Sequence, residues 1–225
     1  MRILALVAAR GGSKRIVGKN LKLLGGRPLV AWSIASATRV PELCDVLMST
    51  DDTAIADVAR NAGALVPWLR PAELSTDHAT AVDVALHALD WYERNRGMVD
   101  GLLLLQPTSP FRRDETILRG VDLFRRNPDC TVLGMSPASS HPMWTFRIED
   151  GLAQPFLGID GLRLRSQDLP SAYVVNGGFY LIAPNLLRQQ RSFYHGKILP
   201  LIFNDAGEDL DIDTEADWKV AESLL

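Results

Sequence analysis

The chain has 225 residues, of which 47% are hydrophobic and 23% are charged, the balance of an ordinary globular protein with one substantial core. Its 24 Lys and Arg against 27 Asp and Glu give a net charge of −3, which argues against a general nucleic-acid binder. Its 2 cysteines are too few for a disulfide framework or a zinc cluster. No apolar run approaches the roughly 20 residues that a membrane span needs. We therefore expect a cytoplasmic protein without a membrane or nucleic-acid partner.

Short apolar runs alternate with amphipathic stretches along most of the chain, which is the pattern of a parallel sheet covered by helices. The expected strands cover residues 3–8, 45–49, 101–105, 131–135, 173–182 and 198–203. Helices are expected to begin at Pro28, at Asp51–Thr53 and at Thr80. Asp114 is expected to cap a further helix, and a last helix covers 214–225. The sequence thus predicts an open, mostly parallel, doubly wound Rossmann-like α/β sheet.

This alternation stops after about residue 137. Residues 138–172 contain short apolar fragments, turn signals at Asp150–Gly151 and Asp160–Gly161, and no long helix. We interpret the chain as a single domain over residues 1–225, into which a small β-rich arm is inserted at about residues 138–175. Dimerisation is one role for such an arm.

A glycine-bearing basic loop follows the first strand directly. In open α/β sheets, ligands bind beyond the carboxyl ends of strands, which makes this loop a candidate site. Its glycines allow backbone N–H groups to approach a polyphosphate, and its cations are Arg10, Lys14, Arg15 and Lys19. The competing interpretation is a surface turn with solvated cations. Neither the Walker pattern nor the dinucleotide fingerprint is present, so any metal ion must be held elsewhere.

An acidic pair near the C-terminus provides the candidate metal ligands. In an extended segment, residues two apart point to the same side, so Asp211 and Asp213 can face one pocket while Ile212 faces the core. Two carboxylates together with phosphate oxygens suit a hard cation such as Mg²⁺. The alternative is local, because Thr214 and Asp217 fit a helix capping box.

Seven segments, in this order, resemble the acylneuraminate cytidylyltransferases, which are also called CMP-sialic acid synthetases. They are Ala9-Arg10-Gly11-Gly12-Ser13-Lys14 through Lys19-Asn20, Ser49-Thr50-Asp51-Asp52, Arg70-Pro71-Ala72-Glu73-Leu74, Leu105-Gln106-Pro107-Thr108-Ser109-Pro110, Gln167-Asp168-Leu169-Pro170, Asn176-Gly177-Gly178, and Asp211-Ile212-Asp213-Thr214-Glu215. The segments span nearly the whole chain, which makes the match far more specific than a single glycine motif.

The resemblance implies a nucleotidyltransferase fold and an enzyme that depends on Mg²⁺. Its reaction would move CMP from CTP to the anomeric hydroxyl of a nine-carbon α-keto acid sugar and release pyrophosphate. It also implies a homodimer in which the arm reaches the partner's sugar site. The roles carried over are catalysis for Arg10, Lys19 and Asp211, nucleotide binding for Arg10, Gly11, Gly12, Ser13, Lys14, Asn20 and Arg70, sugar binding for Gln106 and Asn176, and metal binding for Asp211 and Asp213.

The departures from the family pattern lie at the sugar end. Trp144, Ser166 and Val174 stand where the family usually has basic residues. Arg163 or Arg165 would supply the missing sugar-binding charge if the arm shifts by one residue. We therefore hypothesise a more apolar nonulosonic acid, such as a diacetamido sugar of the legionaminic type, with its extra methyl group on the Trp144 indole. The alternatives are a cytidylyltransferase for an eight-carbon ulosonate and a non-catalytic nucleotide-sensing module.

Overall fold

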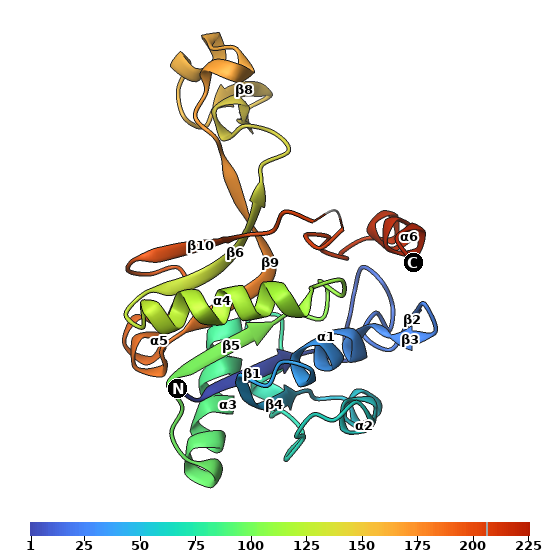
Figure 1. Cartoon of the computed structure of the whole chain (residues 1–225). Helices are drawn as coiled ribbons and strands as arrows, with labels where there is room; N and C mark the ends of the chain where they lie inside the picture. Colours follow the sequence, from blue (N-terminus) through green and yellow to red (C-terminus); the bar gives the residue numbers. More distant parts are fainter. Residues whose placement is uncertain (206) are drawn as a thin grey trace.

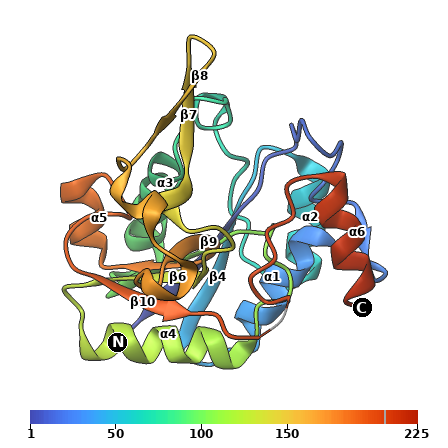
Figure 2. The same ribbon diagram turned by 90° about the horizontal axis from the view of Figure 1, so that it is seen from above.

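A six-stranded sheet with the strand order β10-β6-β9-β5-β1-β4 forms the centre of the protein (Figures 1 and 2). The structure is a computed structural model that describes residues 1–205 and 207–225. The strands of this sheet are β1 (Ile3–Ala8), β4 (Leu43–Ser49), β5 (Gly101–Leu105), β6 (Thr131–Pro137), β9 (Tyr173–Ile182) and β10 (Ile198–Ile202). Strand β9 runs antiparallel to its neighbours β5 and β6, and the other neighbouring strands pair in parallel. The predicted open, mostly parallel α/β sheet is therefore confirmed.

Helices cover both faces of this sheet (Figure 1). One face packs against α1 (Leu29–Thr38), α2 (Thr53–Asn61) and α4 (Asp114–Arg126), and the other against α3 (Ala81–Arg96) and α5 (Pro184–Gln190). In β1, Ile3 and Val7 face the first layer, whereas Leu4 and Leu6 face the second. Burial on both faces explains why this strand is a continuous apolar run. Within the described residues, no helix combines the length and the apolar character that a bilayer crossing requires.

Local signals placed most helix starts correctly. Asp52 caps α2 by accepting hydrogen bonds from the backbone N–H groups of Ala54 and Ile55. The α4 prediction was wrong in detail, because Arg113 is the N-cap residue of that helix and makes no side-chain capping bond. Asp114 instead pairs with Arg39 at 2.7 Å. The short hairpin of β2 (Leu23–Leu24) and β3 (Arg27–Pro28), helix α5 and the 3₁₀ turn η1 (Ala72–Leu74) were not predicted.

The segment between β6 and β9 projects away from the sheet (Figure 1). It contains the hairpin of β7 (Phe146–Glu149) and β8 (Leu152–Pro155), and the 3₁₀ turns η2 (Pro142–Trp144), η3 (Asp160–Arg163) and η4 (Ser166–Asp168). Its large exposed apolar side chains are Phe146, Ile148, Leu152, Phe156, Leu157, Ile159 and Leu164. Apolar side chains gathered on a projecting segment are typical of an interaction surface.

Candidate active site

The basic loop after β1 lies against the C-terminal segment through a small apolar cluster. Ile16 from the loop packs with Ile212 and with Trp218 of α6 (Glu215–Ser223), and all three side chains are almost fully buried. The backbone N–H of Ile212 donates to the Thr108 carbonyl at 2.8 Å, just beyond the end of β5. Three segments that are far apart in the sequence therefore meet at the carboxyl ends of β1 and β5.

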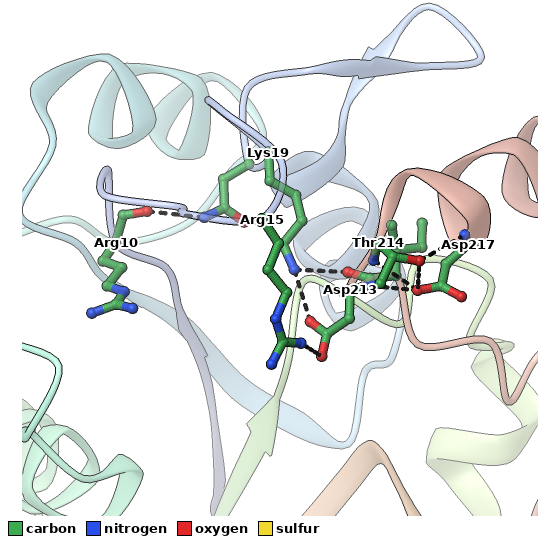
Figure 3. A network of polar contacts seen from close by, with 8 residues as sticks. Arg10, Arg15, Lys19, Asp213, Thr214 and Asp217 are labelled. Atoms are coloured by element: carbon green, nitrogen blue, oxygen red, sulfur yellow. Dashed lines mark hydrogen bonds and ion pairs between the residues drawn. The ribbon is translucent and has the colours of Figure 1, made fainter.

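Two cations of the loop converge on one carboxylate of the acidic pair (Figure 3). Arg15 Nη1 lies 2.5 Å from Asp213 Oδ2, and Lys19 Nζ lies 3.1 Å from Asp213 Oδ1. Lys19 Nζ also donates to the Ile212 carbonyl at 2.7 Å, and its side chain is only 11% exposed. Lys19 is thus held at the wall of the site by the C-terminal segment, with its charge beside Asp213.

The other two cations of the loop bind a carboxylate that the sequence analysis did not single out. Asp77 accepts from Arg10 Nη1 at 2.7 Å and from Lys14 Nζ at 2.5 Å. The hydrogen bonds from Lys14 and Arg10 hold the pKa of Asp77 at about 2, well below its ordinary value. The side chain of Arg10 extends away from Asp213 in Figure 3. The four cations of the loop are therefore divided between two carboxylates, Asp77 and Asp213.

Asn20 and Arg70 brace the beginning of the loop from beneath. Asn20 Nδ2 donates to the Arg10 carbonyl at 3.1 Å, and Arg70 Nη2 donates to the Ala9 carbonyl at 3.2 Å. Arg70 also lies 3.6 Å from Asp51 Oδ1. Burial lowers the pKa of Arg70, and the charge of Asp51 opposes this effect.

Gly11 sits against the start of α2. Its backbone N–H donates to Asp51 Oδ1 at 3.1 Å, and a Cβ atom at this position would lie 2.6 Å from Asp52 Oδ2. The close approach explains why the loop needs glycine here, because any side chain would displace the residue that caps α2. The neighbouring Gly12 has open space around it.

A cavity of about 510 Å³ opens between the loop and the end of β5. Its lining includes the predicted residues Arg10, Ser13, Lys14, Lys19, Asn20, Gln106 and Asp213. A second cavity of about 260 Å³ lies beside Arg70 and Asp77, and a third of about 270 Å³ lies beside Tyr180 and Phe193. Leu104 and Ala81 line all three cavities, which makes them parts of one cleft. An extended cleft with a cationic centre suits a charged ligand of two or three connected groups.

Gln106, Gly177 and Asp211 lie close together near the end of β5. Gln106 lines the cleft, whereas Gly177 and Asp211 are not among the lining residues of its three cavities. A Cβ atom on Gly177 would lie 3.2 Å from Gln106 Oε1 and 3.6 Å from Asp211 Oδ2. Gly177 has a φ of +75°, a left-handed conformation that favours glycine. The loss of solvent around its carboxyl group raises the pKa of Asp211, the charge of Asp213 adds to the increase, and Lys19 counteracts it.

Asn176 and Arg165 lie differently from the other predicted residues. The Asn176 amide is buried, and it donates to Ser136 Oγ at 2.9 Å and accepts from the Gly178 N–H at 3.0 Å. Arg165 precedes η4 on the projecting arm, where it pairs with Asp168 at 2.7 Å, and it lines none of the three cavities of the cleft. The structure therefore buries Asn176 in β9, where it lines none of the three cavities, and leaves Arg165 outside the cleft.

The cavity beside Tyr180 is another feature that the sequence analysis missed. Its lining includes Phe193, Tyr194 and Arg191, which follow the unpredicted helix α5. The hydroxyl groups of Tyr180 and Tyr194 lie 3.4 Å apart. Burial and this contact raise the pKa of Tyr180, so its hydroxyl stays protonated at neutral pH. The alternating pattern of β9 places Tyr180 on a strand, but no sequence motif indicates that it faces a cleft.

Comparison with known proteins assigns the chain to an enzyme family. The cytidylyltransferase family matches residues 4–135, which is more than half of the chain. The chain belongs to the cytidylyltransferase family. It is 39% identical to CMP-N,N'-diacetyllegionaminic acid synthase of Legionella pneumophila, over 100% of this chain and 97% of that protein. It is 30% identical to N-acylneuraminate cytidylyltransferase of Streptococcus agalactiae, over 97% of this chain and 52% of that protein.

A solved structure supports the fold of this cytidylyltransferase. CMP:2-keto-3-deoxy-manno-octonic acid synthetase complexed with CTP is similar with a TM-score of 0.71 and 15% identity, over 100% of this chain and 98% of that one. The family that the seven segments predicted is confirmed, and so is the prediction of a nucleotidyltransferase.

Proposed function

We propose that this cytidylyltransferase moves CMP from CTP to the anomeric hydroxyl of a nonulosonic acid of the diacetamido, legionaminic type. The observation that carries the proposal is the 39% identity, along the whole chain, to a protein named for CMP-N,N'-diacetyllegionaminic acid. The replacement of three usual basic positions by Trp144, Ser166 and Val174 points in the same direction.

The basic side of the cleft would hold the nucleotide. Arg10, Lys14 and Lys19 face the central cavity, and they would oppose the roughly four negative charges of CTP. The backbone of Gly11, Gly12 and Ser13 would border the phosphates, with the Gly12 N–H as the donor, since the Gly11 N–H is bonded to Asp51 and the Ser13 N–H to the Gly11 carbonyl. The cavity beside Arg70 would receive the nucleoside, with Asn20 and Arg70 holding the loop that borders it. Positioning and charge neutralisation are the main requirements of phosphoryl-type transfer.

The other side of the cleft would hold the sugar. The cavity beside Tyr180 combines apolar walls from Leu104 and Phe193 with polar groups from Gln106 and Tyr194, a combination that suits an acetamido group. The anomeric oxygen would attack the α-phosphorus and form the new P–O bond. The bond from the α-phosphorus to the bridging oxygen would break, pyrophosphate would leave, and the hydroxyl proton would pass to water.

The acidic pair fits a divalent cation. Asp213 already attracts two cationic side chains, and the charge of Asp213 contributes to the raised pKa of Asp211, so the two carboxylates are close enough to repel each other. Among residues 1–205 and 207–225, no group of three His, Cys, Asp or Glu side chains forms a complete metal site. Mg²⁺ is commonly held by one or two carboxylates together with substrate phosphates, which matches this donor set. When bound by Asp211 and Asp213, it would neutralise phosphate charge and lower the pKa of the sugar hydroxyl.

The arm would act in a homodimer. Its exposed apolar side chains need a partner surface, and a second copy of the chain offers an identical one. Arg165 lines none of the cavities of its own cleft and would instead serve the partner's sugar site. The Trp144 indole N–H donates to the Gly161 carbonyl at 3.2 Å, so the half-buried ring is fixed in place and could receive an acetamido methyl group.

Pyrophosphate release tests the proposal directly. The purified protein is assayed with Mg²⁺, each of the four nucleoside triphosphates, and a panel that contains N-acetylneuraminate, its 7-acetamido-7-deoxy relatives and an eight-carbon ulosonate. We expect release with CTP only, and fastest release with a diacetamido nonulosonic acid. A clear preference for N-acetylneuraminate would overturn the diacetamido assignment. A preference for the eight-carbon sugar would overturn the nonulosonic class, and CTP binding without any turnover would favour the nucleotide-sensing alternative.

A further inference from the structure

A fully buried arginine is bonded to the backbone of Gln106, a residue that lines the cleft, and is not used by the proposed reaction. Arg112 follows the loop after β5 and is 2% exposed. Its Nε donates to the Gly178 carbonyl at 2.5 Å, its Nη2 to the Gln106 carbonyl at 3.1 Å, and its Nη1 to Ser33 Oγ at 3.4 Å. One guanidinium group thus joins the segment after β5, strand β9 and helix α1.

The two carbonyl groups that it binds lie where regular strand pairing fails. The β5–β9 ladder ends at the pair Leu104–Tyr180, so the Gln106 carbonyl lies beyond it. In the β6–β9 ladder, Leu133 pairs with Tyr180 but Met135 pairs with Val175, which leaves residues 176–179 in a bulge. Buried carbonyl groups outside a ladder need another donor, and Arg112 supplies one to each of these segments. The Gln106 carbonyl also accepts from Ser33 Oγ at 3.1 Å and from the Ser109 N–H at 3.3 Å, so the part that Arg112 adds is the link between this carbonyl and Gly178.

These segments carry Gln106, which lines the cleft, and Gly177, which lies beside both Gln106 and Asp211. Gly177 occupies the bulge, and its position relative to Gln106 and Asp211 is the close approach described above. Asn176, in the same bulge, accepts a hydrogen bond from the Gly178 N–H, while the Gly178 carbonyl accepts from Arg112. A shift of the bulge relative to the end of β5 would therefore change the position of the Gln106 side-chain amide and of the residues around it.

We propose that Arg112 is a positioning residue for the sugar side of the cleft, because it holds the Gln106 and Gly178 backbone segments in register. The inference rests on the proposed function, which places the sugar beside Gln106. It assigns no contact with either substrate to Arg112. The basic loop that would hold CTP has its own bracing from Asn20, Arg70 and Asp51, so loss of Arg112 should affect the two substrates unequally.

The chemistry of the guanidinium explains why arginine suits this position. Arg112 uses nitrogen atoms on both sides of a rigid planar group to reach two carbonyl groups and a hydroxyl, which a lysine ammonium on a flexible stem cannot reproduce. Burial lowers the pKa of Arg112 to about 10, and the buried carboxylate of Glu208 opposes this effect. The group therefore remains a cation at neutral pH and donates from all of these atoms.

The test compares Arg112→Met and Arg112→Lys with a matched control, Arg113→Met. Arg113 is the next residue, but its exposed side chain pairs with Asp205 at 2.9 Å, away from the cleft. The KM values for CTP and for the sugar are measured separately with Mg²⁺ present. Backbone amide hydrogen exchange is followed in the free proteins for residues 9–14, 105–109 and 174–179. If Arg112→Met does not fold, Arg112→Lys, which keeps the positive charge, is compared with the control in its place.

We expect Arg112→Met to raise the sugar KM by about tenfold or more, since small displacements at a reacting site have large effects. The KM for CTP should stay within about threefold of wild type, and Arg112→Lys should show a smaller change of the same kind. Exchange should accelerate at 105–109 and 174–179, but not at 9–14. Equal increases in both KM values, or exchange at 174–179 unchanged from the Arg113→Met control, would overturn the positioning role. If wild type turns over no sugar, the proposed function fails on that result, while the exchange measurement still decides the role of Arg112.

Discussion

Arg10 donates a hydrogen bond to Asp77 at 2.7 Å, although the two residues lie 67 positions apart in the chain. Lys14 binds the other oxygen of the same carboxylate. Both cations belong to the loop that would receive the triphosphate. In the free enzyme, Asp77 therefore competes with the nucleotide for Arg10 and Lys14. This internal competition gives a first prediction about CTP affinity.

Asp77→Asn should strengthen CTP binding, because the nucleotide no longer displaces a carboxylate from Arg10 and Lys14. The expected gain is about threefold, the scale of an exposed ion pair, and it should shrink as salt is added. Isothermal titration calorimetry with CTP measures it. Asp57→Asn is the control, since Asp57 is exposed and pairs with Arg60 at 2.8 Å outside the cleft. Unchanged or weaker binding in Asp77→Asn would contradict the competition.

Arg10→Ala should weaken CTP binding by about 1.5–3 kcal/mol, the scale of a lost charge-assisted hydrogen bond. The side chain lines both the central cavity and the cavity beside Asp77, so its loss removes charge where the phosphates are expected. The same titration with Arg60→Ala serves as the control, because that arginine lies on α2. An affinity equal to wild type would place the phosphates elsewhere.

Asp211→Asn should abolish Mg²⁺-dependent pyrophosphate release while the protein stays folded. Its pKa is raised, which means that ionising Asp211 in the folded state costs free energy relative to the unfolded chain. Removing the charge should therefore not lower the thermal unfolding temperature at pH 7. Activity assays and differential scanning calorimetry on the same preparation check both parts. Retained activity that still requires Mg²⁺ would remove Asp211 from the proposed metal site.

Asp217→Ala should destabilise the fold by about 0.5–2 kcal/mol at pH 7, since Asp217 forms a capping box with Thr214. Hydrogen bonds from the Thr214 side chain and backbone lower the pKa of Asp217. The stabilisation should therefore be complete above the ordinary carboxyl pKa and be lost as the pH falls below about 4. Urea unfolding at pH 7 and pH 3 measures this difference. Asp122→Ala, an exposed position on α4, should show little effect at either pH.

A charged substitution on the arm should dissociate the proposed homodimer. Ile148 and Leu152 are 70% and 64% exposed on the β7–β8 hairpin, and glutamate at both positions would place charges in an apolar interface. We expect multi-angle light scattering to report a monomer that binds CTP normally but turns over sugar poorly. Met98→Glu, which changes an exposed methionine after α3, is the control. A wild-type protein that is already monomeric would contradict the role of the arm.

Local sequence signals predicted much of the fold. These signals depend only on residues that are near each other in the chain, so neighbouring positions suffice to predict the strand or helix that they form. Examples are the apolar run of β1, the capping residue Asp52 and the capping box at Thr214. The capping prediction for Asp114 failed because its carboxylate pairs with a distant residue, Arg39, which follows the end of α1. The candidate site was predicted from the loop cations and the acidic pair, whose chemistry is apparent from residue types alone.

The sequence by itself determined the alternation of strands and helices, the basic loop at the end of β1 and the two aspartates near the C-terminus. Only the tertiary structure decided which charges meet, because Arg15 and Asp213 are 198 positions apart and are joined through the burial of Ile16 against Ile212 and Trp218. The same holds for Arg112, because its proposed role depends on the Gly178 carbonyl, which a bulge in β9 leaves outside the strand ladder. Partners of this kind depend on strand order and packing, which no short stretch of sequence specifies.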